Sequence, residues 1–205
     1  MPGRAEIVTF DDSPPPPGVD AWVGGADAPT PPIEIVEPDP AWPQQFIGFA
    51  DRIRDALGWR ALQVEHVGST SVPGLPAKPI IDVDLTVADP GCEQCYVPAL
   101  AAAGFTLTIR EPWFYGHRQL RATSKPWCNV HVFGYDSPEL VRHRIFRDWL
   151  RGNADERDRY AAIKRQAATG AVEAGEQVMQ YNARKEQVVR EIYQRTFVAM
   201  GLLEN

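Results

Sequence analysis

HVGSTSVPGLPAKPIIDVDL, residues 66–85, is the stretch that decides the fold. It joins a turn rich in small and hydroxyl residues to a lysine, and then to two aspartates set in an apolar run. Residues 80–87 are aliphatic apart from those acids and Thr86, which predicts a β-strand. Because side chains alternate faces along a strand, Asp82 and Asp84 share one face and the aliphatic residues beside them share the other.

Two neighbouring carboxylates in a half-buried place predict a cation site. Leaving both ionised is costly unless a cation neutralises them, and oxygen ligands of this kind suit Mg²⁺ or Mn²⁺. Just upstream, Gly68 would let backbone N–H groups approach an anion, and the hydroxyls of Ser69, Thr70 and Ser71 would add donors. We therefore expect a metal-bound phosphate at this segment.

This arrangement resembles the nucleotidyltransferase superfamily with the DNA polymerase β-like core, in which a Gly-Ser turn precedes an Asp-x-Asp pair on the next strand. Residues 66–85 as a whole are similar to the signature of the GrpB family, a group of predicted nucleotidyltransferases. The similarity covers about residues 33–200 and also includes Trp42, residues 129–133 and residues 146–151. It implies Mg²⁺-dependent transfer of a nucleoside monophosphate from a nucleoside triphosphate to an unknown acceptor.

Two further pairs of residues match recurring positions of the family. Tyr160 precedes Lys164 by four residues, and Tyr181 precedes Lys185 by the same spacing, in segments that look helical. Residues at this spacing share a helical face, so each pair would direct a phenol and an ammonium toward a base or a phosphate. The alternative is a solvated face with the tyrosine half inserted into the core, and the sequence leaves both open.

The remaining candidates are cations and histidines. Lys78 lies between two prolines, a rigid position that favours a phosphate contact, while Arg147 would bind phosphate or pair with an aspartate. The strand at 127–133 carries no acid where the superfamily places its third carboxylate, so His131 is expected to take that metal position, contact the phosphate or activate the acceptor. Glu111 and Asp136 are possible substitutes for the carboxylate, and His66 is either structural or part of the site.

A missing third carboxylate favours a second interpretation. The chain would then be a catalytically weak nucleotide-binding or coenzyme A-related accessory domain, and a hydrolase using water as acceptor is a third possibility. The net charge of −6 disfavours general nucleic-acid binding, although residues 138–205 hold twelve Lys or Arg against ten acids. A small anion fits this balance better than a long polymer.

The chain of 205 residues is long enough for one well-packed domain. Residues 1–32 are rich in proline and glycine and are expected to form an extended or mobile tail, with a short edge strand at 6–10. Residues 33–205 would form the domain, an α/β or α+β fold with a mixed sheet and flanking helices on one side. Strands are expected at 33–36, 61–66, 80–87, 105–110, 113–122 and 127–133, and helices at 41–57, 91–103, 138–152, 153–170 and 175–200.

Three cysteines give no even set of disulfide pairs, and no signal or membrane-length segment is present, so we expect a cytoplasmic protein. Cys92 and Cys95 have the spacing of half a zinc site or of a redox pair. No second cysteine pair accompanies them, which favours two plain thiols at the start of a helix.

Overall fold

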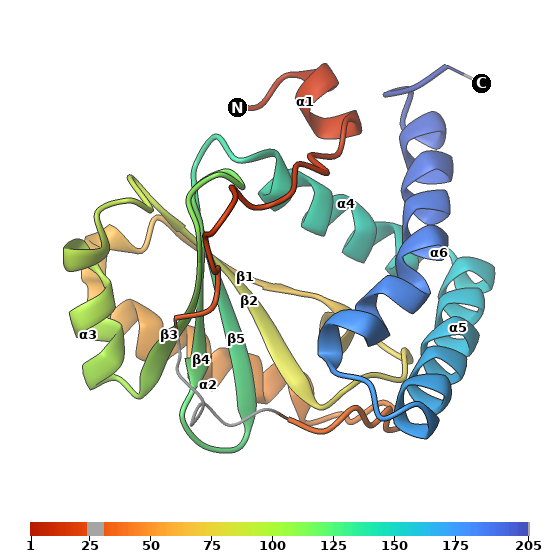
Figure 1. Cartoon of the computed structure of the whole chain (residues 1–205), viewed down its shortest axis with the longest axis horizontal. Coiled ribbons are helices and arrows are strands. Elements are labelled where there is room, and N and C mark those ends of the chain that lie inside the picture. Colours follow the sequence, from red (N-terminus) through yellow and green to blue (C-terminus); the bar gives the residue numbers. More distant parts are fainter. Residues whose placement is uncertain (24–30, 205) are drawn as a thin grey trace.

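The computed structural model describes residues 1–23 and 31–204, which form a mixed five-stranded sheet flanked by helices (Figure 1). The strand order is β1-β2-β5-β4-β3, with β2 and β5 parallel and every other neighbouring pair antiparallel. The α/β class expected from the sequence is thereby confirmed. The strands are β1 (Gln63–Val67), β2 (Ile80–Val87), β3 (Phe105–Glu111), β4 (His117–Ala122) and β5 (Trp127–Gly134).

One face of the sheet packs against α2 (Trp42–Leu57) and α3 (Val97–Ala102). Ile81, Val83 and Leu85 point into this core from β2 and are fully buried, as the alternation of the sequence predicts. Ile53 meets them from α2 and is also fully buried. This layer anchors the central strand that carries the two aspartates.

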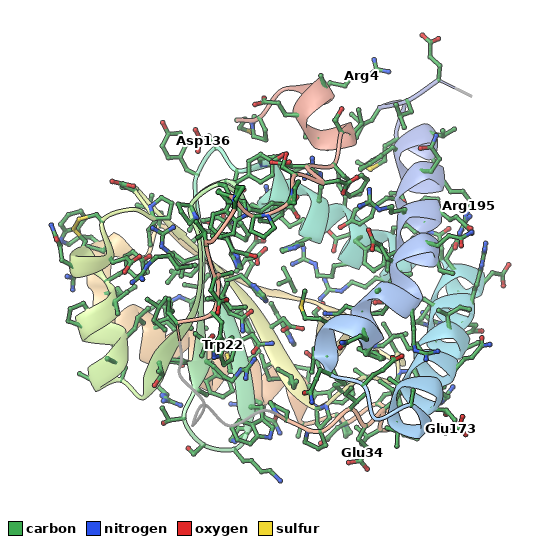
Figure 2. The ribbon with its side chains drawn as sticks, in the orientation of Figure 1. Arg4, Trp22, Glu34, Asp136, Glu173 and Arg195 are labelled. Atoms are coloured by element: carbon green, nitrogen blue, oxygen red, sulfur yellow. A yellow bond between two sulfur atoms is a disulfide. The ribbon has the colours of Figure 1, made fainter. Side chains whose placement is uncertain are left out.

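The opposite face lies under α4 (Pro138–Gly152), with α5 (Ala154–Glu173) and α6 (Val178–Ala199) beside it (Figures 1 and 2). The expectation that the helices flank only one side is therefore wrong. Seven of the eight residues of β2 are buried, so both of its faces need a cover. Helix α4 begins at a Ser137 cap whose hydroxyl accepts the Glu139 N–H, and it then crosses the face that carries Asp82 and Asp84.

Several predicted elements are shorter than expected. Residues 33–36 contribute only an isolated bridge between Val36 and Ala77, rather than a full strand. The helix expected at 91–103 is split into a 3₁₀ turn at Glu93–Cys95 and the short α3. The strand expected from 113 begins at His117, because Tyr115 and Gly116 adopt positive φ angles of 51° and 68° in a turn.

The N-terminal segment is not a strand at residues 6–10, as the sequence led us to expect. Residues Arg4–Val8 form the short helix α1, and the carbonyls of Glu6, Ile7 and Thr9 accept hydrogen bonds from the Arg142 guanidinium. That guanidinium is fully buried, and its hydrogen bonds satisfy these carbonyls without a neighbouring strand.

A second part of the same segment pairs with the sheet. The Val23 N–H donates to Thr108 over 2.9 Å, and the Arg110 N–H donates to Ala21 over 2.8 Å. Trp22 forms an antiparallel bridge with Ile109 on the outer edge of β3. Residues 1–23, called the N-terminal arm below, therefore contact both α4 and the sheet.

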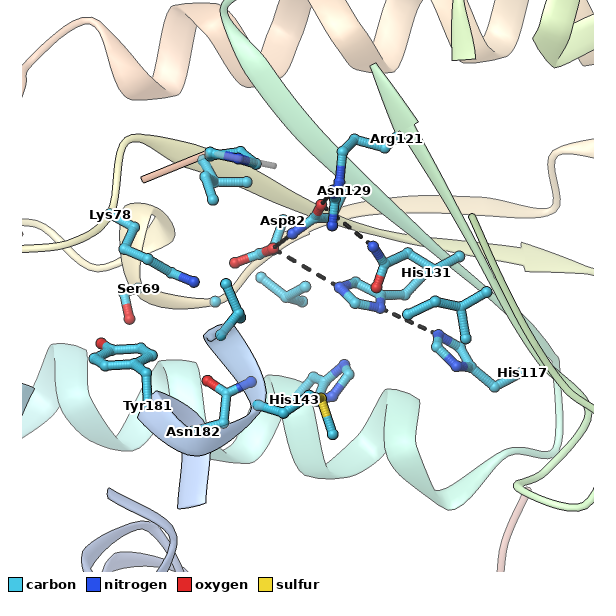
Figure 3. A pocket seen from close by; sticks show the side chains of 18 of the residues that line it. Ser69, Lys78, Asp82, His117, Arg121, Asn129, His131, His143, Tyr181 and Asn182 are labelled. Carbon is cyan, nitrogen blue, oxygen red and sulfur yellow. Dashed lines mark hydrogen bonds and ion pairs between the residues drawn. The ribbon is translucent and has the colours of Figure 1, made fainter. Parts of the chain in front are cut away.

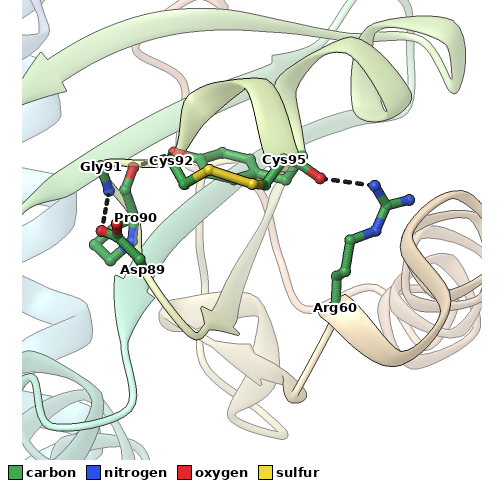
Figure 4. The surroundings of a disulfide bond; sticks show 7 residues. Arg60, Asp89, Pro90, Gly91, Cys92 and Cys95 are labelled. Atoms are coloured by element: carbon green, nitrogen blue, oxygen red, sulfur yellow. Dashed lines mark hydrogen bonds between the residues drawn. A yellow bond between two sulfur atoms is a disulfide. The ribbon is translucent and has the colours of Figure 1, made fainter.

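Cys92 and Cys95 form a disulfide, so the two free thiols that we expected are not present (Figure 4). The 3₁₀ turn brings residues three apart onto one side, which places the two sulfurs together. The Cys95 carbonyl also accepts a hydrogen bond from Arg60. Cys128 is a buried free thiol.

None of the helices in the described part of the chain combines the length and apolar character needed to cross a membrane.

Candidate functional site

The register of the sheet brings distant residues into two rows on the face beneath α4. In one row, Asp82 on β2 pairs with Asn129 on β5, which pairs with Arg121 on β4. In the other, Asp84 pairs with His131, and His131 with Gln119. Directly paired residues share a face, so both rows line the same surface.

A cavity of about 580 Å³, here called the central pocket, lies between this surface and helices α4, α5 and α6 (Figure 3). Its floor includes Asp82, Asn129 and His131 from the sheet. Its opposite wall comes from the first turns of α6 and from lysines.

Gly68 fits against Asp82 so closely that no other residue can replace it without movement. Its φ is +67°, and a Cβ atom there would lie 2.3 Å from Asp82 Oδ2. The glycine is thus required both by its backbone conformation and by the approach of the carboxylate.

The three hydroxyls after Gly68 have different positions. Thr70 is buried and donates to the Ile80 carbonyl, and Ser71 is buried and donates to the Gly68 carbonyl over 2.6 Å. Both hydroxyls therefore stabilise the turn. Ser69 lines the central pocket and is the hydroxyl residue of the three that faces a ligand.

Asp82 is the carboxylate that faces the pocket. Its Oδ1 accepts a hydrogen bond from Asn129 Nδ2 over 3.0 Å and lies 3.7 Å from His131 Nε2. Burial disfavours the charged carboxylate, but His131, Asn129 and Lys78 outweigh this effect and hold the pKa of Asp82 below its usual value. Asp82 is therefore ionised at neutral pH.

Asp84 is almost fully buried, with 1% of its surface exposed, and it already has a partner. His143 on α4 places Nδ1 at 3.0 and 2.9 Å from its two oxygens. Burial lowers the pKa of His143, but the charge and hydrogen bond of Asp84 dominate and raise it to about 9. The pair is an imidazolium bound to a carboxylate.

This arrangement does not fit a divalent cation in the way that the sequence predicts. Both oxygens of Asp84 bond His143, and within residues 1–23 and 31–204 no three His, Cys, Asp or Glu side chains are grouped as metal ligands. Asp82 and Asp84 do share a face, as predicted, but Asp84 is bound to His143, so Asp82 is the one of the two that faces the pocket.

A chain of polar side chains extends from Asp82 across the sheet. His131 Nδ1 is 3.2 Å from His117 Nε2, and His117 Nδ1 is 2.7 Å from Glu111 (Figure 3). Burial lowers the pKa of His117. Glu111, a suggested substitute for the third carboxylate, lines the pocket and contacts His117, whereas Asp136 is not among the described residues that line it.

Three lysines form what we call the lysine wall, namely Lys78, Lys164 and Lys185. The Nζ atoms of Lys78 and Lys185 lie 5.1 and 4.9 Å from the centre of the Tyr181 ring. Lys164 is 2% exposed and donates to the Pro76 carbonyl over 2.8 Å. Burial and the charge of Lys185 lower the pKa of Lys78 to about 8, and the same two causes lower the pKa of Lys164.

Tyr181 is fully buried behind these ammonium groups. Its hydroxyl has no hydrogen-bond partner in the part of the chain that the structure describes. Since an unpaired buried hydroxyl is costly, this atom is a candidate donor to a bound ligand.

Other predicted residues lie outside the pocket. Tyr160 is buried in a cluster with Phe146, as the alternative interpretation of its helix suggested. Arg147 bonds Asp148 and the His66 carbonyl, and it is absent from the pocket lining among the described residues. His66 stacks on a phenylalanine, burial lowers its pKa to about 4, and it is absent from the pocket lining among the described residues.

The sequence did not point to His117, Arg121 or His143 as site residues. His117 and Arg121 lie on β4, a strand in which apolar and polar residues do not alternate regularly, so the pattern did not show which side chains share a face. His143 lies on α4, in a stretch without a recognisable motif. One sequence signal was present: the chain has four histidines, and three of them line the central pocket.

Comparison with known proteins identifies the family to which the chain belongs. The family model described as GrpB protein matches residues 32–195. UPF0157 protein BH1888 of Halalkalibacterium halodurans is 48% identical over 163 residues, which cover 80% of this chain and 82% of that protein. UPF0157 protein SCO7215 of Streptomyces coelicolor is 42% identical and covers 70% of this chain and 73% of its own length.

A dephospho-CoA kinase of Mycolicibacterium paratuberculosis is 33% identical over 197 residues, covering 81% of this chain but 46% of the kinase. Among solved structures, the crystal structure of conserved protein GrpB from Enterococcus faecalis superposes with a TM-score of 0.72 at 29% identity, covering 82% of this chain and 99% of that one. The resemblance expected from residues 66–85 is thus confirmed, while the wider superfamily stays a prediction. The chain belongs to the GrpB family.

Proposed function

We propose that the central pocket binds a nucleotide through its phosphates. The observation that carries this proposal is the lysine wall, in which Lys78, Lys164 and Lys185 bring three lysine side chains to one side of a partly enclosed cavity. Charged lysine side chains in such a site repel each other and lose hydration. A polyvalent anion bound between them would offset both costs and so stabilise the site.

The surroundings of the wall suit a phosphate. Helix α6 begins at Val178, and its first turn lines the pocket, where backbone N–H groups lack intrahelical acceptors and favour anions. Ser69 and the unpaired Tyr181 hydroxyl add donors nearby. The matched relatives named dephospho-CoA kinase are consistent with a phosphate ester as ligand, and a coenzyme A precursor belongs in the same panel of candidates.

Nucleotidyl transfer is the second candidate, and the position of Asp82 and Asp84 favours it. Both carboxylates lie on one face of β2, and Asp82, which contacts Gly68, faces the pocket ionised. His131, next to Asp82, would take the proton of an acceptor hydroxyl as that hydroxyl attacks the α-phosphorus and pyrophosphate leaves. Mg²⁺ dependence belongs to this candidate, and Asp82 is the carboxylate that would hold the ion, because His143 already binds Asp84.

Isothermal titration calorimetry with tripolyphosphate, nucleoside triphosphates and coenzyme A precursors tests the first proposal in a buffer without phosphate. We expect Lys78→Ala and Lys185→Ala each to weaken binding at least tenfold, since each removes one charged contact. Lys125→Ala is the matched control, because Lys125 is exposed and outside the pocket lining. Absence of binding to any of these anions, or an equal effect of Lys125→Ala, would refute the proposal.

Turnover separates the two candidates. Pyrophosphate release with a pool of acceptors is measured with and without Mg²⁺, in the wild type and in Asp82→Asn. A transferase loses release in the variant while it keeps tripolyphosphate binding. If tripolyphosphate binds but no pyrophosphate is released under any condition, the result supports the binding function and excludes nucleotidyl transfer to the acceptors tested.

A further inference from the structure

The N-terminal arm supplies one residue to the central pocket although the GrpB family match begins only at residue 32. Residues 21–23 extend the sheet beyond the edge strand β3 through two backbone hydrogen bonds of 2.9 and 2.8 Å. This pairing fixes Trp22 opposite Ile109. Both residues line the pocket.

The register places the Trp22 indole on the functional face. Trp22 pairs with Ile109, Ile109 with Gln119, and Gln119 with His131, so all four side chains lie on the face of the sheet that bears Asp84. The Trp22 side chain is 37% exposed and lines the pocket.

Arg121 connects the indole to the polar floor. Its guanidinium lies 5.9 Å from the centre of the Trp22 ring, and its Nε donates to Asn129, which in turn donates to Asp82. A cation at this distance from an indole holds the ring in place. The charge of the same Arg121 also acts on Lys78 of the lysine wall and contributes to lowering its pKa.

We infer that Trp22 is the stacking platform for the aromatic base of the ligand, so that the pocket selects nucleotides over phosphate esters without a base. The inference rests on the proposed function, because the lysine wall must hold the phosphates for the base to reach Trp22. Tryptophan stacks on any base with similar strength, so the platform distinguishes base-bearing from base-free ligands more than one base from another. The arm thereby adds a specificity determinant from outside residues 32–195.

The test compares two probes, tripolyphosphate and a nucleoside triphosphate, by calorimetry on the full chain. The wild type is expected to bind the nucleotide more tightly than tripolyphosphate. Trp22→Ala should weaken the nucleotide about 5- to 150-fold, the range for losing one base stack, and leave tripolyphosphate unchanged. Trp22→Phe should keep part of the advantage, because a smaller ring still stacks.

Trp59→Ala is the matched control, because Trp59 is 85% exposed and lies outside the pocket lining. The backbone pairing of residues 21–23 needs no indole, and thermal melting of each variant reports whether the fold is kept. Equal binding of the nucleotide by wild type and Trp22→Ala overturns the inference, and so does an equal loss for both probes. If the wild type binds neither probe, the proposed function fails first and the inference falls with it.

Discussion

At the scale of single residues, the candidate site depends on close contacts between charged or constrained groups. Gly68 leaves room for Asp82, and His143 neutralises Asp84. The lysine wall shows the opposite case, in which burial and mutual repulsion lower the pKa values of Lys78 and Lys164. Each contact makes a separate prediction.

Gly68→Ala is expected to destabilise the protein more than Gly74→Ala. Both glycines have positive φ, 67° and 78°, so each alanine carries a backbone cost of about 1–2 kcal/mol. Only at Gly68 does the new Cβ meet a carboxylate at 2.3 Å, whereas at Gly74 the nearest atom is 3.9 Å away. Urea denaturation measures the two free energies of unfolding, and equal losses would show that Asp82 moves aside freely.

His143→Ala is expected to lower the free energy of unfolding by about 3–5 kcal/mol, because it leaves the buried Asp84 carboxylate without its partner. Adding Asp84→Asn should restore part of that loss, since the remaining side chain carries no charge. A double-mutant cycle measured by urea denaturation gives the coupling energy. A coupling near zero would mean that another group takes the place of His143.

Binding of tripolyphosphate is expected to weaken as the pH rises through about 8, the pKa of Lys78 in the free protein. The charged form of Lys78 attracts the anion, so affinity is greatest below this pH, and binding near pH 8 takes up protons because the anion raises the lysine pKa. Calorimetry in two buffers of different ionisation enthalpy measures the uptake. The pH dependence of tripolyphosphate affinity should become weaker in Lys78→Met and stay unchanged in Lys125→Ala.

At the scale of secondary-structure elements, the structure of the N-terminal arm differs most from the structure that its sequence predicts. Proline and glycine predict a tail there, yet α1 and residues 21–23 find partners on α4 and β3. Local patterns could not show this, because the partner of α1 is one buried arginine about 135 residues away. The same reason hides His143, whose role depends on α4 crossing the polar face of β2.

Arg142→Met is expected to release the arm and to cost about 2–4 kcal/mol, because three backbone carbonyls lose a charged donor. Hydrogen exchange of residues 4–10 should rise sharply. Arg144→Met is the control on the same helix, since Arg144 is 37% exposed and makes a looser ion pair with Glu65. Unchanged exchange in Arg142→Met would place the anchor of the arm elsewhere.

At the scale of the whole molecule, alternating and helical patterns predicted the mixed sheet, the three C-terminal helices and the shared face of Asp82 and Asp84. Lys78 and the two Tyr-Lys pairs were separate candidates, the pairs from the family resemblance, and the fold brings Lys78, Lys164, Lys185 and Tyr181 to the lining of one pocket. What the sequence could not supply is the pairing between layers. Which helices cover each face of the sheet is decided by tertiary packing. Asp84 has His143 as its partner because α4 covers that face.

The lysine wall has a practical consequence for any sample of this protein. If the proposed function is right, a pocket lined by three lysines would attract multivalent anions such as sulfate, citrate or the phosphate of a purification buffer. Such a guest would compete with the physiological ligand and raise the melting temperature by mass action. Purification without phosphate, sulfate or citrate would therefore be needed before an anion that copurifies with the protein could be taken as evidence on the ligand of this pocket.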